Sequence, residues 1–145
     1  MRWILAFIAG FLAVPLGHQI MLTLLRGIGF APFGPWDFTP VPPLGVPNLL
    51  SQSFWGGVWG MVFALIEPRL PRAPALYWSI VAVFGAVALT GVYVAVVMPL
   101  KGAPPPVGSP VPALVSGLLV NAAWGVMAAL LLRLAARMGL AQGRS

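Results

Sequence analysis

Four long apolar stretches divide the chain, and proline-rich or charged segments separate them. The stretches cover about residues 3–25, 48–66, 76–100 and 111–132. Each is close to the roughly 20 residues that an α-helix needs to cross a hydrocarbon core about 30 Å thick. Because a backbone exposed to lipid must satisfy its own hydrogen bonds, we expect every stretch to be a helix. The pattern predicts an all-α integral membrane protein in which four transmembrane helices form one antiparallel bundle.

The first stretch also has the outline of a secretory signal peptide, because Arg2 precedes an apolar run. A signal peptide would end at a small-x-small cleavage site before a polar mature region. The apolar run instead continues through Leu25 without such a site. This favours a first transmembrane helix that is retained.

Composition excludes most soluble classes of protein. The chain has 145 residues, of which 60% are hydrophobic and 7% are charged, whereas soluble domains carry about 25% charged residues. The net charge of +6 would suggest a nucleic-acid partner in a soluble protein. Here the basic residues stand singly at the ends of apolar stretches, so we expect no nucleic acid and a lipid bilayer as the surroundings.

The basic residues also predict an orientation. Six lie on one side of the four stretches and two, Arg26 and Lys101, on the other. The first six are Arg2, Arg69, Arg72, Arg133, Arg137 and Arg144. Because cytoplasmic segments carry the excess of Lys and Arg, both termini are predicted to be cytoplasmic. Segments 27–47 and 101–110 then become outer loops.

Both outer loops are rich in proline. Their many prolines predict turns or polyproline geometry and exclude helix and sheet ladders. The first loop also carries Phe30, Phe33, Trp36 and Phe38, and aromatic rings favour the membrane interface. Two interpretations stay open for this loop: an interfacial cap over the helices, or a docking surface that stiff prolines preorganise for a partner.

The second and fourth stretches resemble each other. When the chain is shifted by 65 residues, 46–72 aligns with 111–137 at nine identical positions out of 27. The identical pairs are Val46/Val111, Pro47/Pro112, Leu49/Leu114, Ser51/Ser116, Trp59/Trp124, Gly60/Gly125, Ala64/Ala129, Leu65/Leu130 and Arg72/Arg137. The first and third stretches align poorly at any offset. We interpret the match as a parallel repeat of two helical hairpins, related by an axis along the membrane normal.

Small residues recur every four positions in both copies. The faces are Gln52, Gly56, Gly60 and Ala64 in one helix, and Gly117, Asn121, Gly125 and Ala129 in the other. Small residues at this spacing allow backbones to approach closely, which drives helix association in lipid. We expect both faces to point into protein, as a packing seam that an interhelical hydrogen bond strengthens. The alternative is a lined pathway for a polar solute.

His18 is the one ionisable side chain well inside a predicted span, and Gln19 follows it directly. At 1.5 Å per residue, His18, Gln52 and Asn121 lie roughly 10, 8 and 14 Å below the outer ends of their helices. His18, Gln19, Gln52 and Asn121 therefore form a candidate polar cluster. Three roles stay open for His18: helix glue, a proton or ligand gate, or a haem or metal ligand that needs a second chain. No cofactor or metal is predicted.

The chain lacks the usual catalytic sets. Asp37 lies in an outer loop and Glu67 at the inner boundary, about a membrane thickness apart, so they cannot act as an acid–base pair. The serines have no G-x-S-x-G setting, and no phosphate-binding loop is present. We expect a protein that is not an enzyme.

Three sequence strings are similar to those of small four-span inner-membrane proteins of proteobacteria that carry no assigned function. They are Phe54-Trp55-Gly56-Gly57-Val58-Trp59-Gly60, His18-Gln19 and Pro42-Pro43-Leu44-Gly45-Val46-Pro47. The resemblance implies a bacterial inner membrane and no activity. Two functions follow as hypotheses. The first is a non-catalytic accessory or scaffold protein that associates with itself or with a larger membrane complex, and the second is a small oligomeric transporter or channel.

Overall fold

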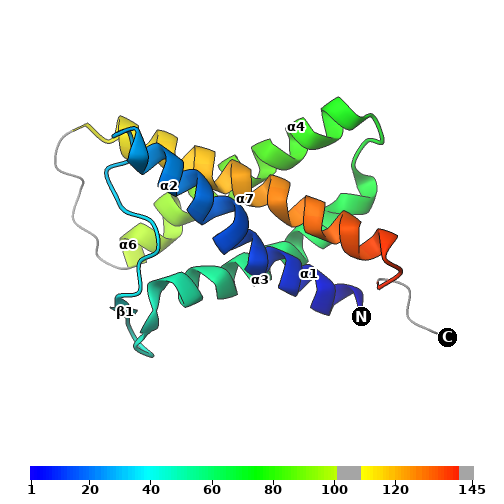
Figure 1. Ribbon diagram of the computed structural model, residues 1–145, viewed down its shortest axis with the longest axis horizontal. Coiled ribbons are helices and arrows are strands. Elements are labelled where there is room, and N and C mark those ends of the chain that lie inside the picture. The colour runs from blue at the N-terminus through cyan, green and yellow to red at the C-terminus, as the bar shows by residue number, and fades with distance from the viewer. Residues whose placement is uncertain (101–108, 141–145) are drawn as a thin grey trace.

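The computed structural model describes residues 1–100 and 109–140, and 77% of the chain is helical. Four helices are long and apolar enough to cross a membrane, as the apolar stretches predicted (Figure 1). We call them span 1 to span 4; they cover Arg2–Gly27, Asn48–Arg69, Pro74–Val97 and Val111–Arg137. Span 4 continues beyond the predicted end near residue 132, because nothing breaks the helix before Gly139, whose φ is +72°.

Span 1 changes its helical pitch in the middle. It consists of α1 (Arg2–Ala13), the π-helical segment η1 (Val14–Gln19) and α2 (Ile20–Gly27). Pro15 lies in η1 and has no N–H to donate, which interrupts the regular hydrogen-bond pattern of an α-helix. Beyond α2 the backbone turns at Gly29, with φ +75°, and the Phe30 N–H closes the helix on the Leu25 carbonyl at 2.9 Å.

The segment after span 1 folds into a short hairpin. Strands β1 (Pro40–Val41) and β2 (Val46–Pro47) pair antiparallel, with a cis Pro42–Pro43 bond between them. The expectation that the prolines exclude a sheet ladder is therefore wrong here. In a ladder of two strands each strand is an edge, and proline is tolerated at strand edges and ends. Most of the second proline-rich loop, 101–110, lies outside the described residues.

The remaining spans differ in regularity. Span 2 is α3 (Asn48–Ile66) followed by the 3₁₀ turn η2 (Glu67–Arg69). Span 3 consists of α4 (Pro74–Phe84), η3 (Gly85–Leu89), α5 (Thr90–Val92) and η4 (Tyr93–Val97), and α6 (Met98–Leu100) continues it. Span 4 is the single helix α7 (Val111–Arg137). Both η3 and η4 are π-helical, so span 3 is the least regular of these three.

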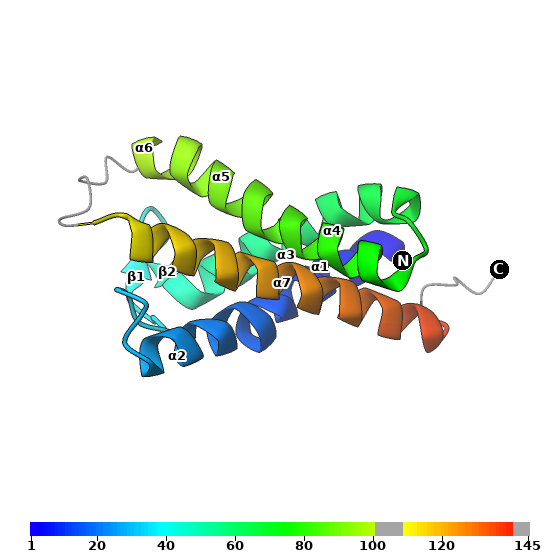
Figure 2. The same cartoon turned by 90° about the horizontal axis from the view of Figure 1, so that it is seen from above.

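The spans pack unequally. Span 1 lies against both span 2 and span 4, and span 3 packs on span 4. Figure 2 shows the far end of span 3, at α5 and α6, separating from α7. In its most apolar window span 3 is 17% buried, compared with 39% for span 1 and 33% for spans 2 and 4. Spans 1, 2 and 4 therefore bury a larger share of their residues than span 3.

The two ends of the molecule have different character. α1 begins and α7 ends at the same end (Figure 1), which carries Arg2, Arg69, Arg72, Arg133 and Arg137 and which we call the arginine end. The opposite end carries segment 28–47 with its hairpin, and we call it the loop end. Lys101 and Arg144, which also entered the predicted orientation, lie outside the described residues.

Candidate functional site

The small-residue face of span 2 packs on span 1. A Cβ added to Gly10 would collide with the Gly56 carbonyl and would lie 2.8 Å from the Gly60 Cα. A Cβ on Gly60 would collide in turn with the Ala6 carbonyl. The two backbones therefore touch at this crossing, and only glycine fits there. Ala64 continues the same face and is buried.

The small-residue face of span 4 packs on span 3 in the same manner. A Cβ on Gly85 would collide with the Asn121 carbonyl, and one on Gly125 would lie 2.7 Å from the Val81 carbonyl. Ala129 is fully buried. Gly117 is looser, because a Cβ there would meet the Thr90 side chain at 3.5 Å. The two small-residue faces thus point into protein and contact spans 1 and 3 at these crossings.

A tryptophan of span 4 reaches the crossing between spans 1 and 2. Trp124 is 1% exposed, and its indole N–H donates to the Gly10 carbonyl at 2.9 Å. Along span 1, the Val14 N–H donates to Phe11 and Pro15 has no N–H. Neither residue therefore donates to Gly10, and the indole supplies a donor to this buried carbonyl.

The polar cluster centres on Gln19, which is 2% exposed. Its amide nitrogen donates to the Gln52 amide oxygen at 2.9 Å, which links span 1 to span 2. Its own amide oxygen accepts the Trp36 backbone N–H at 2.8 Å, which links span 1 to the loop. Both ends of the Gln19 amide are therefore occupied. Gln19 is the last residue of the π-helical segment η1.

Trp36 fastens the loop to span 1 through a second contact. Its indole N–H donates to the Thr23 hydroxyl at 3.1 Å, and that hydroxyl donates to the Gln19 carbonyl at 2.8 Å. Trp36 also has a φ of +58°, a conformation that bulky L-residues rarely adopt. The two hydrogen bonds hold the loop against the end of span 1 and offset the cost of this backbone conformation.

The structure brings together three of the four predicted cluster residues. His18 is half-buried, and its Nδ1 lies 3.4 Å from the Gln19 amide nitrogen, which also reaches Gln52. Asn121 lies elsewhere, and its amide nitrogen donates to the Thr90 hydroxyl of span 3 at 2.9 Å. Two separate polar groups therefore exist, one in each pair of packed spans.

Sequence reasoning missed three residues of these groups. Thr23 follows Gln19 by one helical turn, and this spacing is a usable signal because residues four apart share a helix face. Thr90 is a hydroxyl in the middle of an apolar run, which is also visible in the sequence. Trp36 carries no such signal, because its contact depends on how the loop folds back.

Asp37 ties the loop to the start of span 2. Its carboxylate accepts the Thr39 N–H at 2.9 Å and the Asn48 side-chain amide at 2.8 Å. The hydrogen bonds from Thr39, and then that from Asn48, lower the pKa of this exposed carboxyl group. The negative charge also lies next to the first residue of α3, where the helix dipole favours it.

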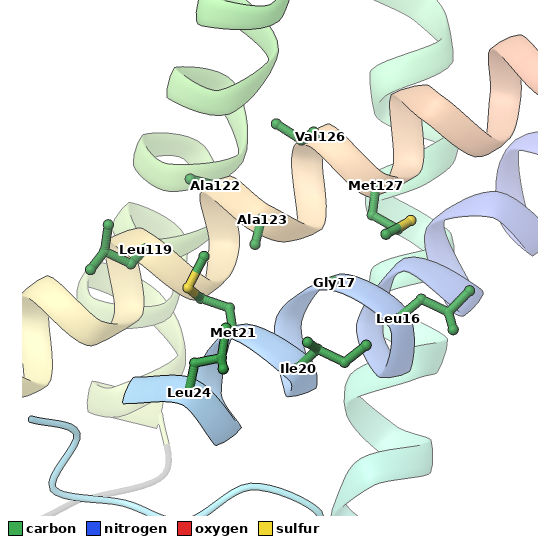
Figure 3. A pocket seen from close by; sticks show the side chains of 10 residues that line it. All are labelled: Leu16, Gly17, Ile20, Met21, Leu24, Leu119, Ala122, Ala123, Val126 and Met127. Atoms are coloured by element: carbon green, nitrogen blue, oxygen red, sulfur yellow. The ribbon is translucent and has the colours of Figure 1, made fainter. Parts of the chain in front are cut away.

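An apolar groove lies between spans 1 and 4 (Figure 3). It has a volume of about 440 Å³. Its lining residues are Leu16, Gly17, Ile20, Met21, Leu24, Leu119, Ala122, Ala123, Val126 and Met127. Because these side chains carry no nitrogen or oxygen, the groove offers almost no hydrogen-bonding partner to a polar solute. Spans 1 and 4 are in close contact at the base of the groove, since a Cβ on Gly17 would lie 2.7 Å from the Ala123 carbonyl oxygen.

Metal-binding side chains do not gather in the described part of the chain. No group of three or more His, Cys, Asp or Glu residues occurs within residues 1–100 and 109–140. Comparison of the chain with protein-family models, curated proteins and solved structures gave no match.

Proposed function

We propose that this chain is a four-span protein of the bacterial inner membrane with both termini in the cytoplasm. Four long apolar helices support the membrane location. The arginine end carries five arginines in the described chain, and the excess of basic residues marks the cytoplasmic side. An antiparallel bundle follows, with the loop end outside. Reporter fusions at Ser145 and in segment 28–47 test the orientation, and an outward Ser145 contradicts it.

We also propose that the two hairpins arose by duplication. Gly10 contacts Gly56 and Gly60, and Gly85 contacts Asn121 and Gly125, which are the same two positions shifted by 65. Gly10 and Gly85 themselves differ by 75, because the first outer loop is longer than the second. At that shift 1–27 and 76–102 share five identities. These are Trp3/Trp78, Gly10/Gly85, Ala13/Ala88, Leu25/Leu100 and Gly27/Gly102.

The function that we propose is that of a non-catalytic accessory or scaffold protein. The observation that carries it is that the side-chain amides of Gln19, Gln52 and Asn121 are hydrogen-bonded within the chain. Gln19 is bonded to Gln52 and Trp36, and Asn121 to Thr90, so these amides act as helix glue. The groove between spans 1 and 4 is apolar. A protein whose helix surfaces are apolar in this way would bind other membrane proteins chiefly by packing its helices against theirs.

A small oligomeric transporter or channel is the second candidate. Its support is the half-buried His18 within a π-helical segment, since π-helical turns are frequent at functional sites. An ionisable side chain at such a depth is also a functional candidate in its own right. Other copies of the chain would have to complete a pathway, because the Gln19 and Gln52 amides are already bonded to each other.

Purification in a mild detergent separates the two functions. The full chain is extracted from its own membrane at native abundance, and the co-eluting proteins are identified by mass spectrometry. The accessory function predicts a membrane protein in fixed stoichiometry, or a homo-oligomer without solute flux in vesicles. A homo-oligomer with flux that His18→Gln abolishes would overturn the accessory function. Normal thermal stability of that variant is the control.

A further inference from the structure

The arginine end carries more positive charge than its own side chains neutralise. In the described chain, five arginines stand at this end against one carboxylate, Glu67, a difference of 5 − 1 = 4 charges. Arg2 donates to the Ala64 carbonyl, and Arg69 donates to the Leu65 carbonyl at 2.7 Å. These two hydrogen bonds orient the arginines and leave their charge uncompensated. This surplus of positive charge favours the binding of anions from outside the chain.

Arg133 is placed differently from the others. It is half-buried, and its guanidinium carbon lies 3.4 Å from the ring centroid of Tyr77 and 5.2 Å from that of Trp78. Tyr77 is 2% exposed, so the ring that supports the guanidinium is fixed. A guanidinium on a ring face keeps its N–H donors around its planar edge. Arg133 is therefore a half-buried cation held over the rings of Tyr77 and Trp78.

The depth of Arg133 matches the headgroup region of a lipid. Arg133 follows Val111, the first residue of α7, by 22 positions, which corresponds to about 33 Å of helix. The hydrocarbon core is about 30 Å thick, so Arg133 lies near its boundary. Tyr77 and Trp78 lie in the first turns of span 3, beginning at Pro74, where aromatic residues typically mark the interface. The phosphate groups of lipids occupy this level.

We propose that Arg133, supported by Tyr77 and Trp78, binds the phosphate of an anionic phospholipid on the side of the membrane that faces the arginine end. The planar donors of Arg match two phosphate oxygens, whereas Lys offers a point charge. Basic pockets between transmembrane helices on the cytoplasmic side are suited to such headgroups. The proposal rests on the membrane residence proposed above and is independent of the accessory function.

Two substitutions that keep the charge test the site. The full chain, in a non-ionic detergent, is titrated with phosphatidylglycerol and with phosphatidylcholine, and native mass spectrometry counts the bound lipid. We expect wild type to prefer phosphatidylglycerol. Arg133→Lys should weaken that binding about fivefold, as loss of the stacked planar donor would. Arg69→Lys, a matched control at the same end, should leave it unchanged.

Trp78→Leu provides a second variant that keeps Arg133, and it should weaken phosphatidylglycerol binding about two- to threefold through loss of one ring. Equal weakening by the two lysine variants, or no weakening by either, would overturn the site. The site would also be overturned if the two lipids bound equally, or if millimolar inorganic phosphate displaced the bound phosphatidylglycerol. The same holds if an acidic protein occupied Arg133 in the purified complex. Thermal unfolding confirms that each variant is folded. Carbonate extraction of membranes tests membrane residence separately.

Discussion

Span 1 and span 3 cross their partner helices in the same way, yet span 1 is far better covered. Gly10 in span 1 and Gly85 in span 3 each touch the backbone of the following span. Beyond the crossing, Gly17 brings span 1 against span 4, and Trp36 holds the loop over its end. The corresponding half of span 3 leaves Gly91 without any neighbour within 4 Å of an added Cβ.

The difference in burial between spans 1 and 3 shows that two factors determine packing. Small residues at a crossing determine how closely two helices approach, and both crossings have them. Burial depends on which further elements cover the pair. Span 1 packs on span 4 as well as on span 2 and is held to segment 28–47, whereas the described part of span 3 packs chiefly on span 4. Substitutions that break the crossings should therefore affect both hairpins, whereas those that remove the covering contacts should affect the first hairpin more.

The largest effect is expected at the crossings. Gly60→Leu and Gly125→Leu should each lower the free energy of unfolding by about 3 kcal/mol or more, because a side chain at either site forces the backbones apart. Gly91→Leu is the control and should have a much smaller effect, since no atom lies within 4 Å of a Cβ added at that position. Unfolding in mixed detergent measures all three. Equal stability of Gly125→Leu and Gly91→Leu would show that the close crossing of spans 3 and 4 does not contribute to the stability of the fold.

The paired tryptophans test the asymmetry between the hairpins. Trp124→Phe should cost about 2–3 kcal/mol, because the buried Gly10 carbonyl loses its donor and a smaller ring leaves a void. Trp59 is half-buried and packs edge-on against Phe84 at 6.1 Å between centroids. Trp59→Phe should therefore cost less than about 1 kcal/mol. The same unfolding assay compares them, and similar losses would contradict the asymmetry.

Substitutions of Gln19 and of its neighbour His18 compare the centre of their polar group with its edge. Gln19→Leu should cost about 1–2 kcal/mol, because Gln52 and the Trp36 N–H both lose their partner. His18→Leu should cost less than about 0.5 kcal/mol, since its one contact, at 3.4 Å, leaves the Gln19–Gln52 bond in place. Protease cleavage within segment 28–47 should rise in the first variant alone. A larger loss for His18→Leu would make the histidine the organising residue.

The smallest effect concerns the attachment of the loop to span 2. Hydrogen bonds lower the pKa of Asp37 in the folded chain, so the charged form is favoured by folding. Its stabilisation is present above the ordinary carboxyl pKa of about 3.9 and is lost as the pH falls through the lower folded value. Proteolysis of segment 28–47 with an acid-active protease should therefore increase at low pH. Asp37→Asn should remove this pH dependence.

Several features of the fold are determined by the sequence alone. Four apolar stretches of membrane length predict four helices because no other structure satisfies their backbones in lipid. The spacing of Gly56, Gly60 and Ala64, and that of Gly125 and Ala129, predicts faces that pack closely. These features are local, since they depend on residue size and on a helical period within one segment.

The tertiary structure decides which segments meet. Asn121 and Gln52 lie at similar depths, which suggested one cluster, but Asn121 pairs with Thr90 because span 3 packs on that face of span 4. Gln19 also accepts the backbone N–H of Trp36, which lies in a loop. The path of a loop cannot be predicted from a helical periodicity. A hydrogen-bond partner from another segment depends on the relative placement of whole helices. Only the packed chain fixes that placement, and with it the hydrogen-bond partners of Gln19 and Asn121.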